Sequence, residues 1–271
     1  MRIRLALVVI AFVLTWAALP GGPRRLLAQA PAGADEIVAR VQQAFYAPGK
    51  DMKARVTMTL ISAGGDKRLR DLTMLRRNGT GGEQQYFIYF HQPGDVRGMT
   101  FLVLKYPRRD DDRWLFMPAL NLVRRIAARD SAQSFVGSDF TYEHVSGRDL
   151  ESDRHTVRGE EQRRGKACYI VESQAQAAAE YSRKVAWIDK ATWLPVEELY
   201  YDVRGELFKE FTADEIREVG GHPTITKRTM KNAKTGHRTE VVFADVAYDV
   251  GIEAEIFSER YLREPPRRWI Q

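Results

Sequence analysis

The chain has 271 residues, enough for one domain with a sizeable core, and its 44% hydrophobic and 29% charged residues exclude a disordered or membrane-spanning protein. The net charge of +6 does not indicate nucleic-acid binding. Four arginines lie in the first thirty residues, where no acid occurs, and the rest of the chain holds 38 Lys and Arg against 36 Asp and Glu, a net of +2. We therefore expect no nucleic acid among the partners.

The chain begins with the pattern of an export signal. Arg2 and Arg4 precede an apolar run of roughly 15 residues, Leu5 to Leu19, and small residues follow. Because this run is too short to span a membrane comfortably, we predict a secretory signal peptide, residues 1–32, that is cleaved on export. The alternative is an uncleaved N-terminal anchor. Cleavage on export would release a single domain, residues 33–271.

Residues 34–46 predict an amphipathic helix, because Ile37, Val41 and Phe45 recur at helical spacing. Beyond it, alternation of apolar and polar residues predicts strands. Candidate strands cover residues 52–61, 67–77, 85–91, 99–106, 113–117, 155–163, 168–173, 181–189, 195–202, 207–217, 224–231 and 238–248. Turn residues separate most of them, which favours antiparallel pairing. We expect residues 257–271 to form an extended tail.

These elements predict a mainly β (α+β) fold: a curled antiparallel half-barrel of about ten or eleven strands, closed by the N-terminal helix and a short helical lid. A sheet with so many strands does not stay flat. Its concave side is either an apolar pocket or a dry core.

The strands are rich in large apolar side chains, which we predict to form the wall of an apolar ligand cavity. The predicted wall consists of Val56, Met58, Leu60, Leu72, Met74, Tyr86, Ile88, Phe90, Phe101, Val103, Trp114, Phe116 and Trp187. The strand period breaks near residue 134, and the predicted lid residues are Phe135, Val136, Phe140 and Tyr142. Arg97, Arg124 and Arg125 are candidates for the cavity rim, where an arginine could meet an acidic headgroup.

No pattern predicts an enzyme. The five histidines show no metal-ligand spacing, and no phosphate-binding or dinucleotide-binding loop occurs, so we expect neither metal nor cofactor. The acidic run Asp110 to Asp112 is typical of a solvated hairpin tip. A third interpretation is a lipid hydrolase that uses Ser138, Asp139 and His144, although the G-x-S-x-G elbow is absent.

Four segments carry a resemblance to a known family. They are PGDVRGMTFLV (93–103), DDRWLFMPALNLVRRI (111–126), SFVGSDFTYE (134–143) and WIDKATWLPVEELYYDVRGELFKEF (187–211). With them, nearly the whole mature chain resembles the LolA-like family of outer-membrane lipoprotein-sorting proteins, in particular the branch associated with RND-type exporters. The resemblance implies a half-barrel closed by helices around a hydrophobic cavity for acyl chains.

The leading hypothesis is a monomeric, non-enzymatic periplasmic carrier that binds acyl chains of a lipoprotein or another lipid and ferries them towards the outer membrane, with transient membrane contact. The alternative is a periplasmic adaptor, a partner module of an inner-membrane RND-type exporter. The resemblance leaves the cargo open among lipoproteins, sterol-like lipids, hopanoids and phospholipids.

Overall fold

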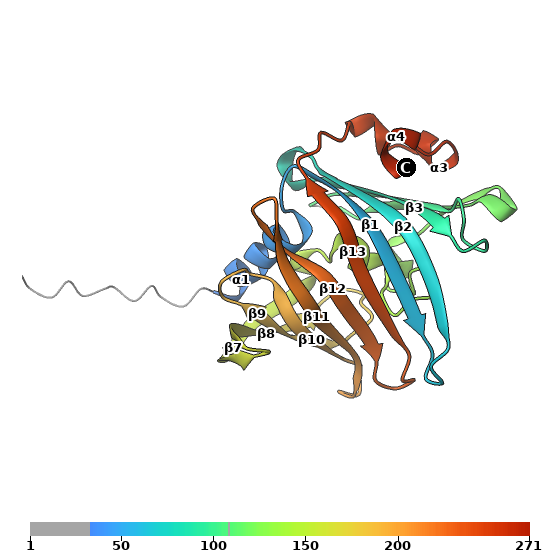
Figure 1. The fold of residues 1–271 in the computed structure, drawn as a ribbon. Helices are drawn as coiled ribbons and strands as arrows, with labels where there is room; N and C mark the ends of the chain where they lie inside the picture. Colours follow the sequence, from blue (N-terminus) through green and yellow to red (C-terminus); the bar gives the residue numbers. More distant parts are fainter. Residues whose placement is uncertain (1–32, 108) are drawn as a thin grey trace, which may run out of the picture. The chain divides into compact units, whose positions relative to one another are not determined.

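The fold is one antiparallel sheet in a computed structural model that describes residues 33–107 and 109–271. The predicted signal peptide, residues 1–32, lies outside the described residues. Thirteen strands follow the order β6-β5-β4-β3-β2-β1-β13-β12-β11-β10-β9-β8-β7 (Figure 1). Their bounds are β1 Asp51–Ile61, β2 Lys67–Asn78, β3 Gln84–Gln92, β4 Thr100–Lys105, β5 Asp112–Met117, β6 Leu122–Arg125, β7 Asp153–Arg163, β8 Lys166–Ala175, β9 Arg183–Asp189, β10 Pro195–Tyr201, β11 Leu207–Val219, β12 His222–Asn232 and β13 Arg238–Tyr248.

The sheet consists of two meanders, β1–β6 and β7–β13, joined where β1 pairs with β13. The edge strands β6 and β7 do not pair, so the sheet curls but does not close into a barrel. The predicted mainly β fold with a curled antiparallel sheet is confirmed. The predicted number of strands is wrong, in part because β6 has only four residues, too few for alternation to reveal.

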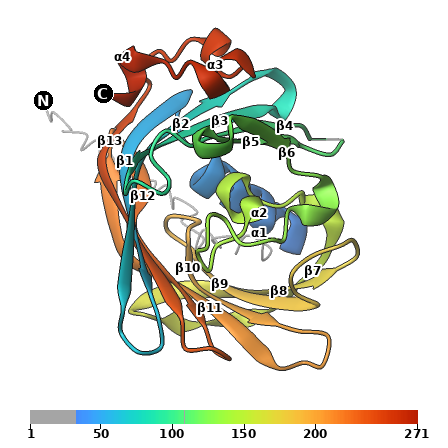
Figure 2. The ribbon, with the colours of Figure 1, turned by 90° about the vertical axis from the view of Figure 1, so that its right-hand side faces the viewer.

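The longer helical segments lie inside the curve of the sheet (Figure 2). The N-terminal helix consists of α1, Ala34–Val41, continued by a π-helical turn, Gln42–Tyr46. Between the meanders, residues 126–152 cross the concave side and include α2, Tyr142–Ser146. The concave core is therefore built from both meanders and from two segments that are not strands.

The C-terminal residues cover the convex face, where we expected an extended tail. Two short helices, α3 (Arg260–Arg263) and α4 (Arg267–Ile270), lie against this face (Figure 1). Their apolar cluster combines Leu75, Phe87, Leu102 and Phe116 of the sheet with Ile252, Ile256, Phe257, Leu262, Trp269 and Ile270. The buried carboxylate of Asp51 accepts hydrogen bonds from the backbone N–H groups of residues 250–252, at 2.8–3.1 Å. The convex cover explains why the strands near residues 101 and 115 are apolar on both faces.

Candidate functional site

The concave face of β1–β4 carries continuous apolar rows. Register places Val56 opposite Leu72, Leu72 opposite Phe90, and Ile88 opposite both Met74 and Phe101. Since successive side chains of a strand alternate between faces, the concave cluster takes every second residue. Ten predicted wall residues lie in this cluster: Val56, Met58, Leu60, Leu72, Met74, Tyr86, Ile88, Phe90, Phe101 and Val103.

The structure does not bring the other three predicted wall residues to this face. On β5, Leu115 belongs to the concave cluster, whereas its neighbours Trp114 and Phe116 pack in the convex cluster. Trp187 packs with Cys168 and Val196. The prediction placed them together because it used ring density rather than the alternation of the strand.

The four predicted lid residues lie together over the wall. Residues 134–146, which we call the lid, form a hairpin followed by α2, and the N–H of Phe135 donates to the carbonyl of Phe140 at 2.8 Å. The ring centroid of Phe101 lies 5.3 Å from that of Phe135 and 5.4 Å from that of Tyr142. Val136 turns the hairpin with φ of 51°, a conformation that costs a β-branched residue about 1–3 kcal/mol.

A polar latch holds the lid to β13. The backbone N–H of Asp139 donates to the hydroxyl of Thr239 at 3.0 Å, and that hydroxyl donates to the Asp139 carboxylate at 2.7 Å. His237 Nδ1 lies 2.6 Å from the same carboxylate. The Ser138 hydroxyl instead donates to the carbonyl of Phe135 at 2.7 Å. The structure therefore does not assemble Ser138, Asp139 and His144 into the hydrolase triad considered above.

The lid helix begins with a capping box that uses a histidine. The N–H of Thr141 donates to Nδ1 of His144 at 3.0 Å, while the N–H of His144 donates to the Thr141 hydroxyl at 3.4 Å. Because Nδ1 accepts, the ring proton sits on Nε2, which lies 3.3 Å from a carboxylate oxygen of Glu180. Burial, followed by the charges of Lys209, Lys184 and Arg228, holds the pKa of His144 well below its usual value.

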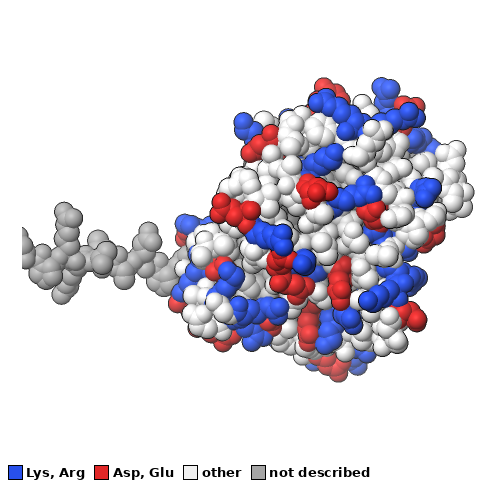
Figure 3. Space-filling model, viewed as in Figure 1, with Lys and Arg blue, Asp and Glu red and all other residues white. Residues whose placement is uncertain are grey.

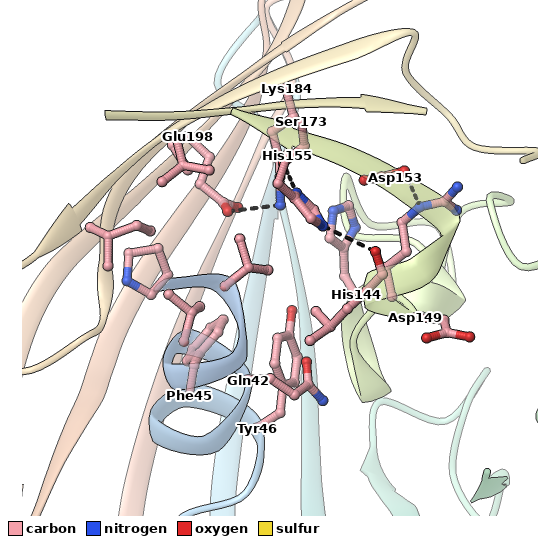
Figure 4. A pocket seen from close by; sticks show the side chains of 18 of the residues that line it. Gln42, Phe45, Tyr46, His144, Asp149, Asp153, His155, Ser173, Lys184 and Glu198 are labelled. Carbon is pink, nitrogen blue, oxygen red and sulfur yellow. Dashed lines mark hydrogen bonds and ion pairs between the residues drawn. The ribbon is translucent and has the colours of Figure 1, made fainter. Parts of the chain in front are cut away.

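Three small cavities lie between the sheet, the N-terminal helix and the lid. The first, about 80 Å³, lies between Phe45, Tyr46 and β8–β10 (Figure 4). The second, about 60 Å³, lies between Phe45, Tyr46 and the strands β12 and β13. The third, about 40 Å³, lies under Phe135 and Phe140 of the lid. Small-molecule sites usually measure roughly 300–1,000 Å³, so the protein's own side chains fill most of the concave side.

The first cavity has a polar wall in which charges are paired. Lys184 Nζ lies 3.1 Å from Glu198, whose other oxygen accepts from the Tyr200 hydroxyl at 2.6 Å. Figure 4 shows Lys184 reaching Glu198 and His155 reaching Ser173, 2.8 Å away. This wall is satisfied within the protein.

Arg228 on β12 also faces inward, and its surroundings are mainly aromatic. It lines both the second and the third cavity, and its guanidinium carbon lies 4.8 Å from the ring centroid of Phe243, 5.2 Å from that of Phe140 and 5.6 Å from that of Phe45. Burial lowers its pKa to about 10. Within the described residues its Nε is buried without a hydrogen-bond partner.

The predicted rim arginines lie elsewhere. Arg97 is exposed in the turn before β4, and Arg124 and Arg125 are exposed on the edge strand β6, where Arg125 pairs with Asp112. Sequence reasoning missed Arg228. Its signal was the strand period, which places Arg228 on the same face as the buried Met230.

Two absences hold for residues 33–107 and 109–271. No group of three or more metal-ligating side chains is placed to hold a metal ion. No helix there is both long and apolar enough to cross a membrane.

On the face shown in Figure 3, acidic and basic side chains are interspersed.

A curled open sheet with an apolar concave face under an N-terminal helix and a lid defines a protein of the LolA-like class. A family model described as "uncharacterized protein" matches residues 82–264. No curated protein matches the chain. This family match, together with the first two of the solved structures that follow, shows that the chain belongs to the LolA-like family.

Three solved structures show the likeness. A DUF1329 family protein from Desulfovibrio piger is 29% identical, with a TM-score of 0.78 over 84% of this chain and 97% of that one. A putative outer membrane lipoprotein-sorting protein domain from Vibrio parahaemolyticus is 28% identical, with a TM-score of 0.79 over 85% and 98%. A LolA superfamily protein from Nitrosomonas europaea shares the fold at 17% identity, with a TM-score of 0.67 over 85% and 99%.

Proposed function

We propose that the protein is a periplasmic carrier that binds the acyl chains of a lipid or lipoprotein and moves them towards the outer membrane. The cargo chain would lie along the concave rows, in the space that the lid and the N-terminal helix fill in this structure. The main support is the cover of the apolar wall of β1–β4. This wall is covered by the lid and the N-terminal helix, which are short segments, and not by a second sheet. The fold that the chain shares with a lipoprotein-sorting protein domain agrees with this role.

Burial of an acyl chain would contribute more free energy than the hydrogen bonds of the latch do. Each methylene moved from water to an apolar surface contributes about 0.8 kcal/mol, so a chain of about sixteen carbons would gain on the order of 10 kcal/mol. Each hydrogen bond of the latch contributes roughly 0.5–1.5 kcal/mol net. The gain exceeds the cost of breaking the latch, which leaves a margin for repacking the lid.

Binding of a fluorescent acyl probe with sixteen carbons tests the proposal. Val241 is buried beside the third cavity, whereas its neighbour Val242 is 39% exposed on the opposite face. Val241→Phe would fill space that the chain needs, and we expect it to weaken binding at least about tenfold. Val242→Phe is the matched control and should bind as the wild type does, with thermal melting confirming that both variants fold.

Two results would contradict the carrier proposal. One is equal binding by the two variants. The other is a wild-type protein that binds no acyl lipid and that, purified from its own host and examined by native mass spectrometry, contains none.

The adaptor function remains a second candidate because of the edge strand β6. Leu120, just before this strand, is 68% exposed, and Leu122, its first residue, is 47% exposed; both lie near the exposed Arg124 and Arg125. If an exporter docks here, reversing both arginine charges should abolish co-purification with the exporter while acyl binding persists. Unchanged co-purification would argue against this docking site.

A further inference from the structure

Among the described residues, inward-facing basic side chains other than Arg228 have partners within the protein; Arg76, which lines the second cavity, donates to the backbone carbonyls of Tyr46 and Pro48. Lys184 pairs with Glu198, Lys209 with Glu180, and Arg148 with both Glu143 and Asp153. For Arg228, the described residues provide neither an ion pair nor a hydrogen bond to the guanidinium. Its Nε is buried without a hydrogen-bond partner, and burying a polar group of a cation without a partner costs free energy. An anionic group next to the guanidinium would therefore be stabilising.

The aromatic rings around Arg228 compensate only in part. Phe45, Phe140 and Phe243 attract the cation through their faces. A guanidinium also has five N–H donors, and benzyl rings offer none of them an oxygen acceptor. Glu198 is the carboxylate whose charge acts on the pKa of Arg228, but it already binds Lys184 and Tyr200. The donors of Arg228 are therefore available to another acceptor.

The position of Arg228 relates it to the apolar wall. It lines the second and third cavities together with Met74, Val145 and Phe243. The third cavity continues along wall residues of β1–β3 under the lid. A chain lying there would be next to the guanidinium. Because its pKa is about 10, Arg228 is charged at neutral pH.

We propose that Arg228 binds an anionic group of the cargo, so that the preferred ligand is an acyl lipid whose chain adjoins a carboxylate or a phosphate. This inference rests on the proposed carrier function and adds the chemical class of the ligand. A guanidinium binds either oxyanion through paired N–H donors. Phe45 on the N-terminal helix and Phe140 on the lid contact the same guanidinium. An anion bound to Arg228 would therefore lie next to both segments.

Three probes that each carry one sixteen-carbon chain test this at pH 8: palmitate, hexadecyl phosphate and methyl palmitate. The wild type should bind at least one of the two anions about tenfold or more tightly than the neutral ester. Whichever anion binds more tightly identifies the source as carboxylate or phosphate. Arg228→Met should remove the preference and leave the affinity for methyl palmitate within about threefold, and Arg228→Lys should retain part of the preference. Arg124→Met, on the exposed edge strand, is the control and should change nothing.

Each outcome is decisive. A wild type that binds the ester as tightly as both anions overturns the role of Arg228 while leaving the carrier function standing, and this arm does not depend on a variant's folding. Equal weakening of all three probes by Arg228→Met would assign the arginine a packing role and would also overturn the proposal. A wild type that binds none of the probes contradicts both the anion site and the carrier function.

Discussion

At the scale of single residues, protonation of the His144 ring would destabilise the lid. Its Nδ1 accepts the Thr141 N–H, so a proton on Nδ1 would remove one half of the capping box. The charged groups that face the ring are Glu180, Lys184, Lys209 and Arg228. The three cations disfavour a positive charge on the imidazole. The lid helix therefore requires a neutral His144.

This requirement predicts a pH dependence of stability. The pKa of His144 is lower in the folded than in the unfolded protein, so the unfolded state binds more protons as the pH falls below about 6.5. Stability from this group is fully present above that pH and is lost below it, by up to about 1.4 kcal/mol per pH unit. Burial raises the pKa of Glu180, which acts in the opposite direction.

Urea unfolding between pH 7.5 and pH 5 measures this effect. His144→Gln should retain the capping box, because glutamine is a favoured residue at that position, and should lose the slope due to His144 while leaving Glu180 in place. His222→Gln is the control and should keep the wild-type slope. The same slope in all three proteins would show that His144 does not control the stability of the closed lid.

At the scale of elements, the strand period predicted most of the sheet and much of the concave face. Val56, Met58 and Leu60 alternate with wet residues along β1, and the structure buries them on one face. The period could not predict that β13 pairs with β1, because this pairing joins strands separated by almost the whole domain. Nor could it predict α3 and α4, since four residues are too few to show a helical repeat.

The same reasoning explains which site residues were misplaced. Ring density suggested Trp114 and Phe116 as cavity wall, but the C-terminal helices give their face of β5 a second apolar cover. Charge suggested the arginines of β6, while Arg228 lay unnoticed in a basic strand. The deciding information was tertiary: which face of each strand meets the lid, and which charge has no partner there.

At the scale of the whole molecule, the lid and the N-terminal helix cover the concave face and leave small cavities beneath them. The cavities of about 80, 60 and 40 Å³ are each too small for an acyl chain. Phe45 and Tyr46 line the first and second cavities, and Val145 lines the second and third, so side chains of the two covers separate the spaces. If the covers move as the carrier proposal requires, we expect the spaces to join into one groove along the wall.

The central claim is that an acyl chain enters beneath the lid, and tethering the lid tests it most directly. The Asp139 and Thr239 side chains are in contact, 2.7 Å apart, so Asp139→Cys with Thr239→Cys can be oxidised to a disulfide whose formation is checked by mass. The native Cys168 is buried and should not interfere. Thr239→Cys alone is the control. We predict that the oxidised double variant takes up palmitate or the fluorescent acyl probe at least about tenfold more slowly than its reduced form, while oxidation leaves the control unchanged. Equal uptake by the oxidised and reduced double variant would show that the chain does not enter beneath the lid.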